Sequence, residues 1–309
     1  MSLTAEWRDR LDAWTQELTR HFHAPVDEVA LEGFVTSEQL NPQQAAERAD
    51  FGPMPPGTRW GSKWEYGWFR AQVTIPKEVE GQRVVFRSQP GGEALAFVNG
   101  RAAGALDSWH KEVVLSRTAS FGDTYDIMIE AYAGHGPRVS SVGPVPPGRA
   151  SVQPAEEAQS TVGISTFGIW REEVYQLWLD VVALTQIRDH IDPTSMRVME
   201  IDAGLKDFTL LVDFEQPEEA MLETVRAARQ RLRPLMECVN GSTAPEMFAF
   251  GHAHLDVAWL WPLAETERKS ARTFANQLAL IEEYPEYRFQ QSQPRSEERR
   301  VGKECATGC

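Results

Sequence analysis

The spacing of apolar residues changes twice along this chain, and this change limits most narrowly how the chain can fold. Residues 2–22 carry apolar side chains every three or four positions, which predicts a helix with Ser2 as its N-cap. From Trp64 to about Ala133 the period becomes two, as in strands. Helical spacing returns beyond residue 160. The stripe of the first helix consists of Trp7, Leu11, Trp14, Leu18 and Phe22.

The middle region consists of short alternating segments separated by Gly, Asn and Pro. WFRAQVTIP, QRVVFRSQ, EALAFVNG, KEVVLS and YDIMIEAYA follow one another at short intervals. The pair Asn99-Gly100 suits a two-residue hairpin turn, because both residues tolerate positive φ. This pattern predicts an antiparallel β-sandwich. Six residues are expected in its core: Phe69, Val73, Val85, Phe97, Val114 and Ile129.

Two irregular stretches border the expected sandwich. Residues 41–63, with FGPMPPG at their centre, predict a connector, and the Pro-rich residues 142–160 predict a boundary. Two helices are expected after that boundary. The first has an apolar face of Trp170, Val174, Leu177, Trp178 and Val181. The second, over residues 218–239, has an apolar face of Leu222, Val225, Ala228, Leu232 and Leu235.

The composition excludes several classes of partner. A net charge of −14 makes nucleic acid an unfavourable partner, because an acidic surface repels phosphates. No stretch approaches the roughly 20 apolar residues of a membrane span, and MSLTAEWRDRLDAW has no signal-peptide pattern. Only three cysteines occur, which fits a reducing, cytoplasmic compartment. Some of the ten tryptophans are expected to serve as platforms for sugar rings, and most to fill cores.

The stretch AFGHAHLDVAWLWP, residues 249–262, concentrates the chemistry of the chain. MFAFGH before it predicts a buried strand, and Pro262 is expected to open a helix at its first position. The motif then follows the carboxyl end of a strand, where open α/β sheets bind their ligands. The buried face of the helix is expected to contain Ala271, Phe274, Leu278 and Ile281.

Two histidines and an aspartate alternate within this motif. His252, His254 and Asp256 share one face if the strand continues that far. Imidazole nitrogen and carboxylate oxygen are good ligands for Zn²⁺ and similar divalent ions, although further ligands must come from elsewhere in the fold. The alternative is that the histidines satisfy backbone groups in a buried turn.

GHAHLDVAWLWP followed by ETERKSARTF resembles the start of the catalytic domain of glycoside hydrolase family 38, the α-mannosidases, in its cytosolic and vacuolar branch. EALAFVNG and IEAYAGHG resemble the N-terminal domain of that branch. The resemblance implies retaining, metal-dependent hydrolysis of terminal α-mannosides from glycans. It places the metal, usually Zn²⁺ with Co²⁺ as an alternative, on His254 and Asp256, and the sugar ring over Trp259. It leaves His252 a structural role or a role in orienting a metal ligand.

The family's nucleophilic aspartate lies well beyond the motif, so the resemblance implies that it lies outside this chain. RSEERRVGKEC, residues 295–305, matches a translated sequencing adapter, and we interpret residues 295–309 as a non-native tail. The chain is therefore expected to be a truncated fragment that is inactive by itself.

These inferences together predict an α+β multidomain protein. An N-terminal helix and connector (residues 1–63) precede a galactose-binding-like β-sandwich (64–150) and a helical linker (151–245). The first strand and helix of an α/β catalytic domain (246–294) and the tail (295–309) follow. The expected partners are α-mannoside glycans, and the full-length protein could form a homo-oligomer. An amidohydrolase-like metal hydrolase and a non-catalytic carbohydrate-binding remnant remain the alternatives.

Overall fold

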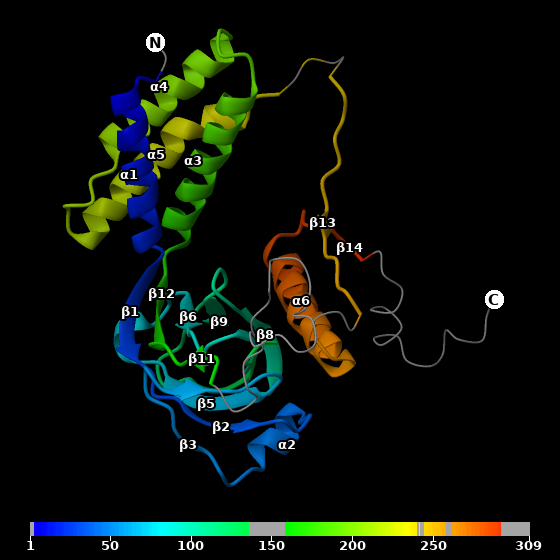
Figure 1. Cartoon of the computed structure of the whole chain (residues 1–309). Coiled ribbons are helices and arrows are strands. Elements are labelled where there is room, and N and C mark those ends of the chain that lie inside the picture. Colours follow the sequence, from blue (N-terminus) through cyan, green and yellow to red (C-terminus); the bar gives the residue numbers. More distant parts are fainter. Residues whose placement is uncertain (1–2, 136–157, 240, 242–243, 258–260, 292–309) are drawn as a thin grey trace. The chain divides into compact units, whose positions relative to one another are not determined.

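A computed structural model describes residues 3–135, 158–239, 241, 244–257 and 261–291 (Figure 1). The chain divides into two compact units. Met1–Ala24 and Ile169–Glu246 form a helical unit, and Pro25–Gly168 and Met247–Cys309 form a unit built on β-sheets. The predicted α+β multidomain class is confirmed.

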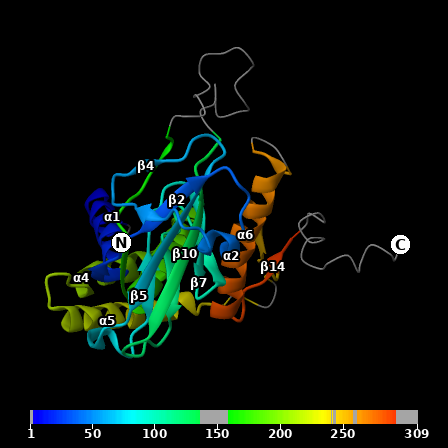
Figure 2. The same cartoon turned by 90° about the horizontal axis from the view of Figure 1, so that it is seen from below.

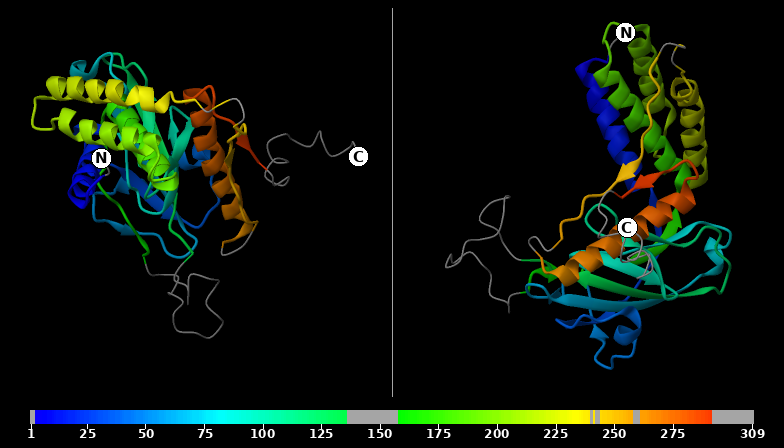
Figure 3. Two further views of the ribbon diagram at one scale, coloured as in Figure 1. Left: turned by 90° about the horizontal axis from the view of Figure 1, so that it is seen from above. Right: turned by 90° about the vertical axis from the view of Figure 1, so that its right-hand side faces the viewer.

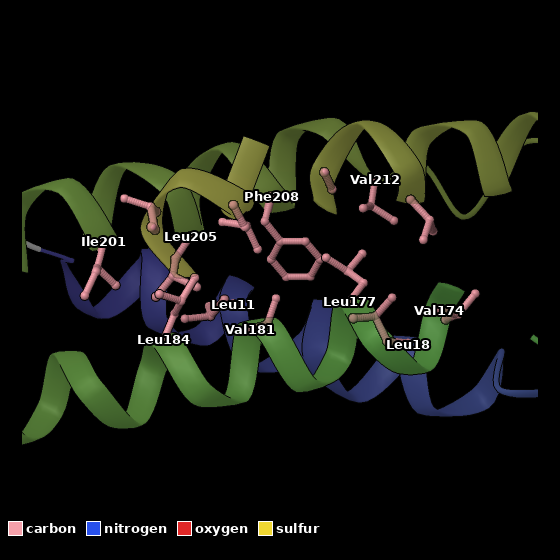
Figure 4. Packing of buried hydrophobic residues seen from close by; sticks show 14 of the residues in the cluster. Leu11, Leu18, Val174, Leu177, Val181, Leu184, Ile201, Leu205, Phe208 and Val212 are labelled. Carbon is pink, nitrogen blue, oxygen red and sulfur yellow. The ribbon is translucent and has the colours of Figure 1, made fainter. Parts of the chain in front are cut away.

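The helical unit is a bundle of four helices. α1 (Ala5–Arg20), α3 (Glu172–His190), α4 (Met196–Leu211) and α5 (Glu218–Met236) pack side by side, with α4 touching each of the others. Figure 4 shows side chains from these helices meeting in one apolar core. The labelled core residues are Leu11, Leu18, Val174, Leu177, Val181, Leu184, Ile201, Leu205, Phe208 and Val212.

The predicted helical stripes agree with this packing. Leu11 and Leu18 of α1 are buried, and Trp7, Trp14 and Phe22 pack against the core. In α3 and α5 the expected apolar faces are buried, apart from Trp178 and Leu222, which are partly buried at the edge, and Trp170, which lies in strand β12 before α3. The N-cap of α1 is Thr4, whose hydroxyl accepts from Trp7 N, and not Ser2, which lies outside the described residues.

The second unit contains the predicted sandwich. A six-stranded antiparallel sheet has the order β3 (Gly52–Pro53), β2 (Glu32–Thr36), β5 (Tyr66–Thr74), β10 (Thr124–Tyr132), β7 (Glu93–Val98) and β8 (Arg101–Leu106) (Figure 2). A four-stranded sheet has the order β1 (His23–Glu28), β12 (Thr166–Trp170), β6 (Val84–Arg87) and β9 (Glu112–Ser116). β4 (Arg59–Trp60) pairs with β11 (Ser160–Thr161).

The strands of the sandwich extend further along the chain than the expected boundary at Trp64. β1 and β2 lie before that residue, and β12 lies beyond residue 150. The stretch 41–63 is not a plain connector, because it holds helix α2 (Pro42–Ala46) together with β3 and β4. Most of the Pro-rich stretch 142–160, up to residue 157, lies outside the described residues.

Four of the six expected core residues are buried in the sandwich: Phe69, Val73, Val85 and Ile129. Phe97 and Val114 are only half-buried, so their assignment to that core is wrong. Phe97 pairs with Met128 in the register and lies on the other face of the sheet, where its ring stacks on Trp68. The outer face of this sheet is therefore also apolar.

The predicted hairpin at Asn99-Gly100 is confirmed. The two residues join β7 to β8 with φ of 49° and 77°, and Val98 pairs with Arg101 across the turn. Both central residues of a type I′ turn need positive φ, which Asn and Gly accept at low steric cost.

Candidate metal and sugar site

The motif begins in a short strand–helix–strand unit. β13 (Gly251–His252) pairs in parallel with β14 (Phe289–Gln290), and helix α6 (Leu263–Glu283) connects them. This arrangement agrees with the expected first strand and helix of an α/β domain. The helix begins at Leu263, so Pro262 is its N-cap and not, as expected, its first residue.

The buried strand expected over MFAFGH is not present in that form. The strand has only two residues, and Met247 and Phe248 are 90% and 78% exposed. Within the described residues β13 pairs with one strand only, and Met247 and Phe248 lie before it in the chain. Apolar side chains of a parallel strand are buried only where both faces of its sheet are covered.

His254 and Asp256 meet in the loop that follows β13. His254 Nε2 lies 3.2 Å from Asp256 Oδ1, and both side chains are open to solvent. The strand ends at His252, so the alternation of an extended strand does not account for this pairing. His252 has an exposed side chain, and Trp259 lies outside the described residues.

The chemistry of the pair fits two positions around a divalent ion. A neutral imidazole nitrogen and a carboxylate oxygen both suit Zn²⁺. Among the described residues, no three side chains of His, Cys, Asp or Glu come together as a metal site. The pair could therefore hold part of a coordination sphere, and at least one further ligand would have to come from another segment.

Side chains at the start of α6 hold the loop in place. Trp261 Nε1 donates to Thr266 Oγ1 at 3.1 Å, and Thr266 Oγ1 donates to the carbonyl oxygen of Asp256 at 3.4 Å. The Trp261 ring also lies beside the His135 ring of the sandwich, with centroids 6.3 Å apart, and the Lys269 ammonium stands over it at 4.6 Å. The position of Asp256 thus depends on the first turn of α6.

α6 packs against the sandwich (Figure 3). Charged side chains, some of them buried, form this contact. Glu265 is fully buried, accepts a hydrogen bond from Tyr66 Oη at 2.9 Å and pairs with Arg272. Arg272 and Lys269 also pair with Glu93 of β7, at 3.2 and 2.5 Å.

Two further ion pairs extend this contact along α6. Arg268 Nε lies 2.7 Å from Glu130 Oε1 of β10. At the other end of the helix, Glu283 pairs with Arg83 and Arg117 at 2.6 and 3.0 Å. The basic part of α6 therefore meets acids of the sandwich, and its acidic end meets bases.

Burial and charge shift several pKa values in this contact. Burial raises the pKa of Glu130, an effect that Arg268 partly offsets. Burial alone would also raise the pKa of Glu93, but Arg272 and Lys269 outweigh it and lower that pKa below its usual value. Burial would lower the pKa of Arg272, but Glu265 and Glu93 raise it further. Burial and neighbouring charge therefore act in opposite directions on Glu93 and Arg272, and for both groups the neighbouring charge prevails.

The buried face of α6 differs from the expected one. Ala271, Leu278 and Ile281 are exposed and Phe274 is half-buried, whereas Glu265, Thr266, Arg272 and Ala275 are buried. The sequence analysis did not identify this charged face. The signal was present in ETERKSAR, because Glu265, Arg268, Lys269 and Arg272 recur at helical spacing. Their sandwich partners lie too far away in the sequence to be inferred from it.

Two families of known proteins match this chain. "Alpha-mannosidase, jelly roll domain" matches residues 25–156, and "Glycosyl hydrolases family 38 N-terminal domain" matches residues 244–300. The second match extends six residues into the segment 295–309, which lies outside the described residues.

The curated relatives of this chain are named alpha-mannosidases. The chain is 28% identical to human alpha-mannosidase 2C1 over 89% of its own length and 26% of the relative's. It is 21% identical to Dictyostelium discoideum alpha-mannosidase G over 77% of its length and 21% of the relative's. It is 47% identical to a Saccharomyces cerevisiae alpha-mannosidase over 15% of its length and 4% of the relative's. The chain spans about a quarter of the length of the first of these relatives.

Solved structures match about half of this chain at a low level. A Faecalibacterium prausnitzii beta-glucuronidase matches 48% of this chain and 32% of its own chain, with 15% identity and a TM-score of 0.32.

The sandwich and the motif-bearing unit after it resemble domains of glycoside hydrolases. More narrowly, the resemblance to the α-mannosidases of glycoside hydrolase family 38 is confirmed, in the jelly roll domain and in the family 38 N-terminal domain. Family 38 α-mannosidases are in general metal-dependent. No helix in the described parts of the chain is long and apolar enough to cross a membrane.

Proposed function

We propose that this protein is a retaining, metal-dependent α-mannosidase that removes terminal α-mannosides from glycans. The observation that carries the proposal is the His254–Asp256 pair, which follows β13 inside the segment that matches family 38. The names of the curated relatives support the same activity. The match to family 38 favours this function over an amidohydrolase-like hydrolase.

The motif residues have separate roles in this proposal. His254 and Asp256 would bind the ion, Zn²⁺ or Co²⁺, and His252 would have a structural role or orient a ligand. When bound, the ion would bind vicinal hydroxyls of the sugar. The indole of Trp259 would cover the apolar face of the ring. Thr266 and Trp261 would keep the loop in position for both contacts.

We further propose that the chain by itself has no turnover. A retaining glycosidase needs two catalytic carboxyl groups about 5 Å apart at the scissile bond, and the motif supplies neither of them. Human alpha-mannosidase 2C1, whose name gives this activity, is about three and a half times as long as this chain. A cytoplasmic location is supported by the resemblance to the cytosolic branch and by the exposed free thiol of Cys238.

The metal assignment is tested in the full-length protein by replacing Asp256 with alanine and measuring bound metal by elemental analysis after dialysis. We expect a drop of at least 10- to 100-fold in affinity, the scale seen when even a supporting contact to a ligand is lost. Glu286→Ala removes another exposed carboxylate and should leave metal content unchanged. Full metal occupancy in a folded Asp256→Ala chain would show that the histidines serve a structural role instead. Chelator-sensitive hydrolysis of an aryl α-mannoside by the 309-residue chain would contradict its proposed inactivity.

A further inference from the structure

We propose that Tyr287 is a positioning residue for the loop that carries His254 and Asp256. Its side chain lies against Gly251, the first residue of β13. Neither Tyr287 nor its hydrogen-bond partner on α6, Gln277, belongs to the motif. The inference rests on the proposed function, because the position of this loop matters for catalysis only if the loop binds a metal ion.

Gly251 has no space for a side chain, because the ring of Tyr287 occupies it. A methyl group on residue 251 would overlap with Tyr287 Oη and would lie 2.7 Å from Tyr287 Cζ and 3.3 Å from Phe289 Cδ2. Non-bonded carbon atoms prefer separations of about 3.5–4.0 Å, so the strand or the ring would have to move by roughly 1 Å. Gly251 does not have a positive φ. Close packing, and not backbone conformation, therefore requires glycine here.

Several hydrogen bonds hold Tyr287 in place. Its hydroxyl donates to Gln277 Oε1 on α6. Its backbone N–H donates to the carbonyl oxygen of Tyr284 at 2.9 Å, in the turn that follows α6. The carbonyl oxygen of the next residue, Arg288, accepts from Gly251 N at 2.7 Å, beside the pairing of β13 with β14. Tyr287 therefore connects the motif strand to α6 as well as to β14.

The part of α6 that contacts Tyr287 is itself attached to the sandwich. Asn276, the neighbour of Gln277, accepts a hydrogen bond from Ala105 N of β8 at 2.7 Å. Adjacent residues of a helix point about 100° apart, so Asn276 can meet the sandwich while Gln277 meets Tyr287. The motif strand is thus linked through α6 to β8, the edge strand of the six-stranded sheet.

The loop is held at two points, and His254 lies between them. One point is Gly251, and the other is the Asp256 carbonyl oxygen, which accepts from Thr266. A chain spans at most about 3.3–3.6 Å per residue, so fixing both points confines His254 to a small volume. Distances from a metal to its ligands tolerate deviations of only about 0.2 Å. A displacement of roughly 1 Å at Gly251 would therefore misalign the pair.

The first measurement tests the packing without any metal. Hydrogen exchange of the amide of residue 251, which donates to Arg288 O, is followed by NMR in the 309-residue chain. Gly251→Ala should lower the protection of this amide about 10- to 100-fold, the range expected for overpacking. Gly241→Ala is the matched control, because among the described residues no atom lies within 4 Å of a methyl group there. Unchanged protection in Gly251→Ala would overturn the proposal.

The second measurement shows whether the contact matters for the metal. In the full-length protein, affinity for Zn²⁺ is measured by competition with a chromophoric chelator. Gly251→Ala should lower it about 10- to 100-fold, the range seen for residues that orient metal ligands, and Gly241→Ala should not change it. The visible absorption of bound Co²⁺, which depends on ligand geometry, should change in Gly251→Ala. In the background of Tyr287→Ala, Gly251→Ala should have little further effect on affinity, because the overlapping ring is gone.

The outcomes separate this inference from the proposed function. Unchanged Zn²⁺ affinity in Gly251→Ala, together with a loss of binding in Asp256→Ala, would overturn the inference alone. An equal loss from Gly251→Ala with and without Tyr287→Ala would also overturn it, because the ring would then not be the cause. Full metal occupancy in Asp256→Ala would overturn the proposed function, and this inference with it.

Discussion

Replacing Arg272 with methionine should loosen helix α6 from the sandwich. Methionine keeps an unbranched apolar side chain but removes the guanidinium that pairs with Glu265 and Glu93. Glu265, which is fully buried, then keeps only the Tyr66 hydroxyl as a hydrogen-bond partner among the described residues. Glu93 is half-exposed and keeps its pair with Lys269. The variant therefore leaves one buried carboxylate without a counter-charge.

The magnitude follows from this burial. Removing one partner of a buried ion pair typically costs about 3–5 kcal/mol, because the remaining charge is desolvated without compensation. The observed loss of stability cannot exceed the total free energy with which α6 packs against the sandwich. Polar contacts that remain include Lys269–Glu93, Arg268–Glu130, the Glu283 pairs and the bond from Ala105 N to Asn276 Oδ1. If these contribute less than the penalty, α6 opens locally while the sandwich stays folded.

Hydrogen exchange of the backbone amides of α6, followed by mass spectrometry, measures this opening directly. A penalty of about 3–5 kcal/mol corresponds to exchange that is faster by roughly two to three and a half orders of magnitude. Arg233→Met is the matched control, because Arg233 and Glu237 form an exposed pair on α5. Exposed pairs contribute about 0–1 kcal/mol, so this control should change little.

The double variant Arg272→Met/Glu265→Gln tests the cause. A glutamine at position 265 carries no charge and can still accept from Tyr66, so it should restore much of the lost protection. Unchanged exchange of α6 in the single variant would refute the reasoning. Exchange of α6 in the double variant that is as fast as in the single variant would show that lost packing, and not the uncompensated carboxylate, was responsible.

Two further predictions concern the sandwich. Phe69→Ala should lower the free energy of unfolding by about 3–5 kcal/mol because Phe69 is fully buried, and Phe97→Ala should lower it clearly less because its ring is half-buried. Urea denaturation of both variants tests this. Equal losses would contradict the assignment of Phe97 to the outer face. Because the pKa of Glu93 is lower in the folded chain, its contribution to stability is fully present above its unfolded pKa of about 4.3 and is lost as the pH falls through the folded pKa. At pH values below about 4 the urea concentration at the unfolding midpoint should therefore decrease, and this decrease should be less steep in Glu93→Gln. Identical pH profiles of the two chains would contradict the predicted stabilisation by Glu93.

The sequence predicted those elements in which polarity separates two faces. Helices α1, α3 and α5 and strands β5 and β10 each bury the side expected from their spacing. α4 could not be predicted in this way, because its interior includes Asp202 and Thr209. Asp202 is tolerated there because it pairs with Arg188 at 2.8 Å and accepts a hydrogen bond from Leu3 N. Such compensation from distant residues does not appear in the spacing of apolar residues.

Phe97 illustrates a second limit of the sequence analysis. In β7 the small residues Ala94 and Ala96 are fully buried, whereas Leu95 and Phe97 line a groove beside α6. The larger size of Phe97 therefore led to its assignment to the wrong face of the sheet. The reason is that both faces of this sheet are covered. The His254–Asp256 pair was predictable since its residues are two positions apart, but the Tyr66–Glu265 bond joins residues 199 positions apart.

The two faces of α6 explain how the sandwich can influence the position of the His254–Asp256 pair. The face with Glu265, Arg272 and Glu283 meets complementary charges of the sandwich, and their order along the helix fixes its direction and axial position. A shift by one turn, about 5.4 Å, would break these pairs. The other face carries Phe274, whose ring meets Phe289 of β14 edge-on with centroids 6.2 Å apart. α6 therefore links the sandwich to the short parallel sheet through one rigid element. Because Thr266 on its first turn donates a hydrogen bond to the Asp256 carbonyl oxygen, displacement of α6 should also displace the Asp256 carboxylate, the proposed metal ligand.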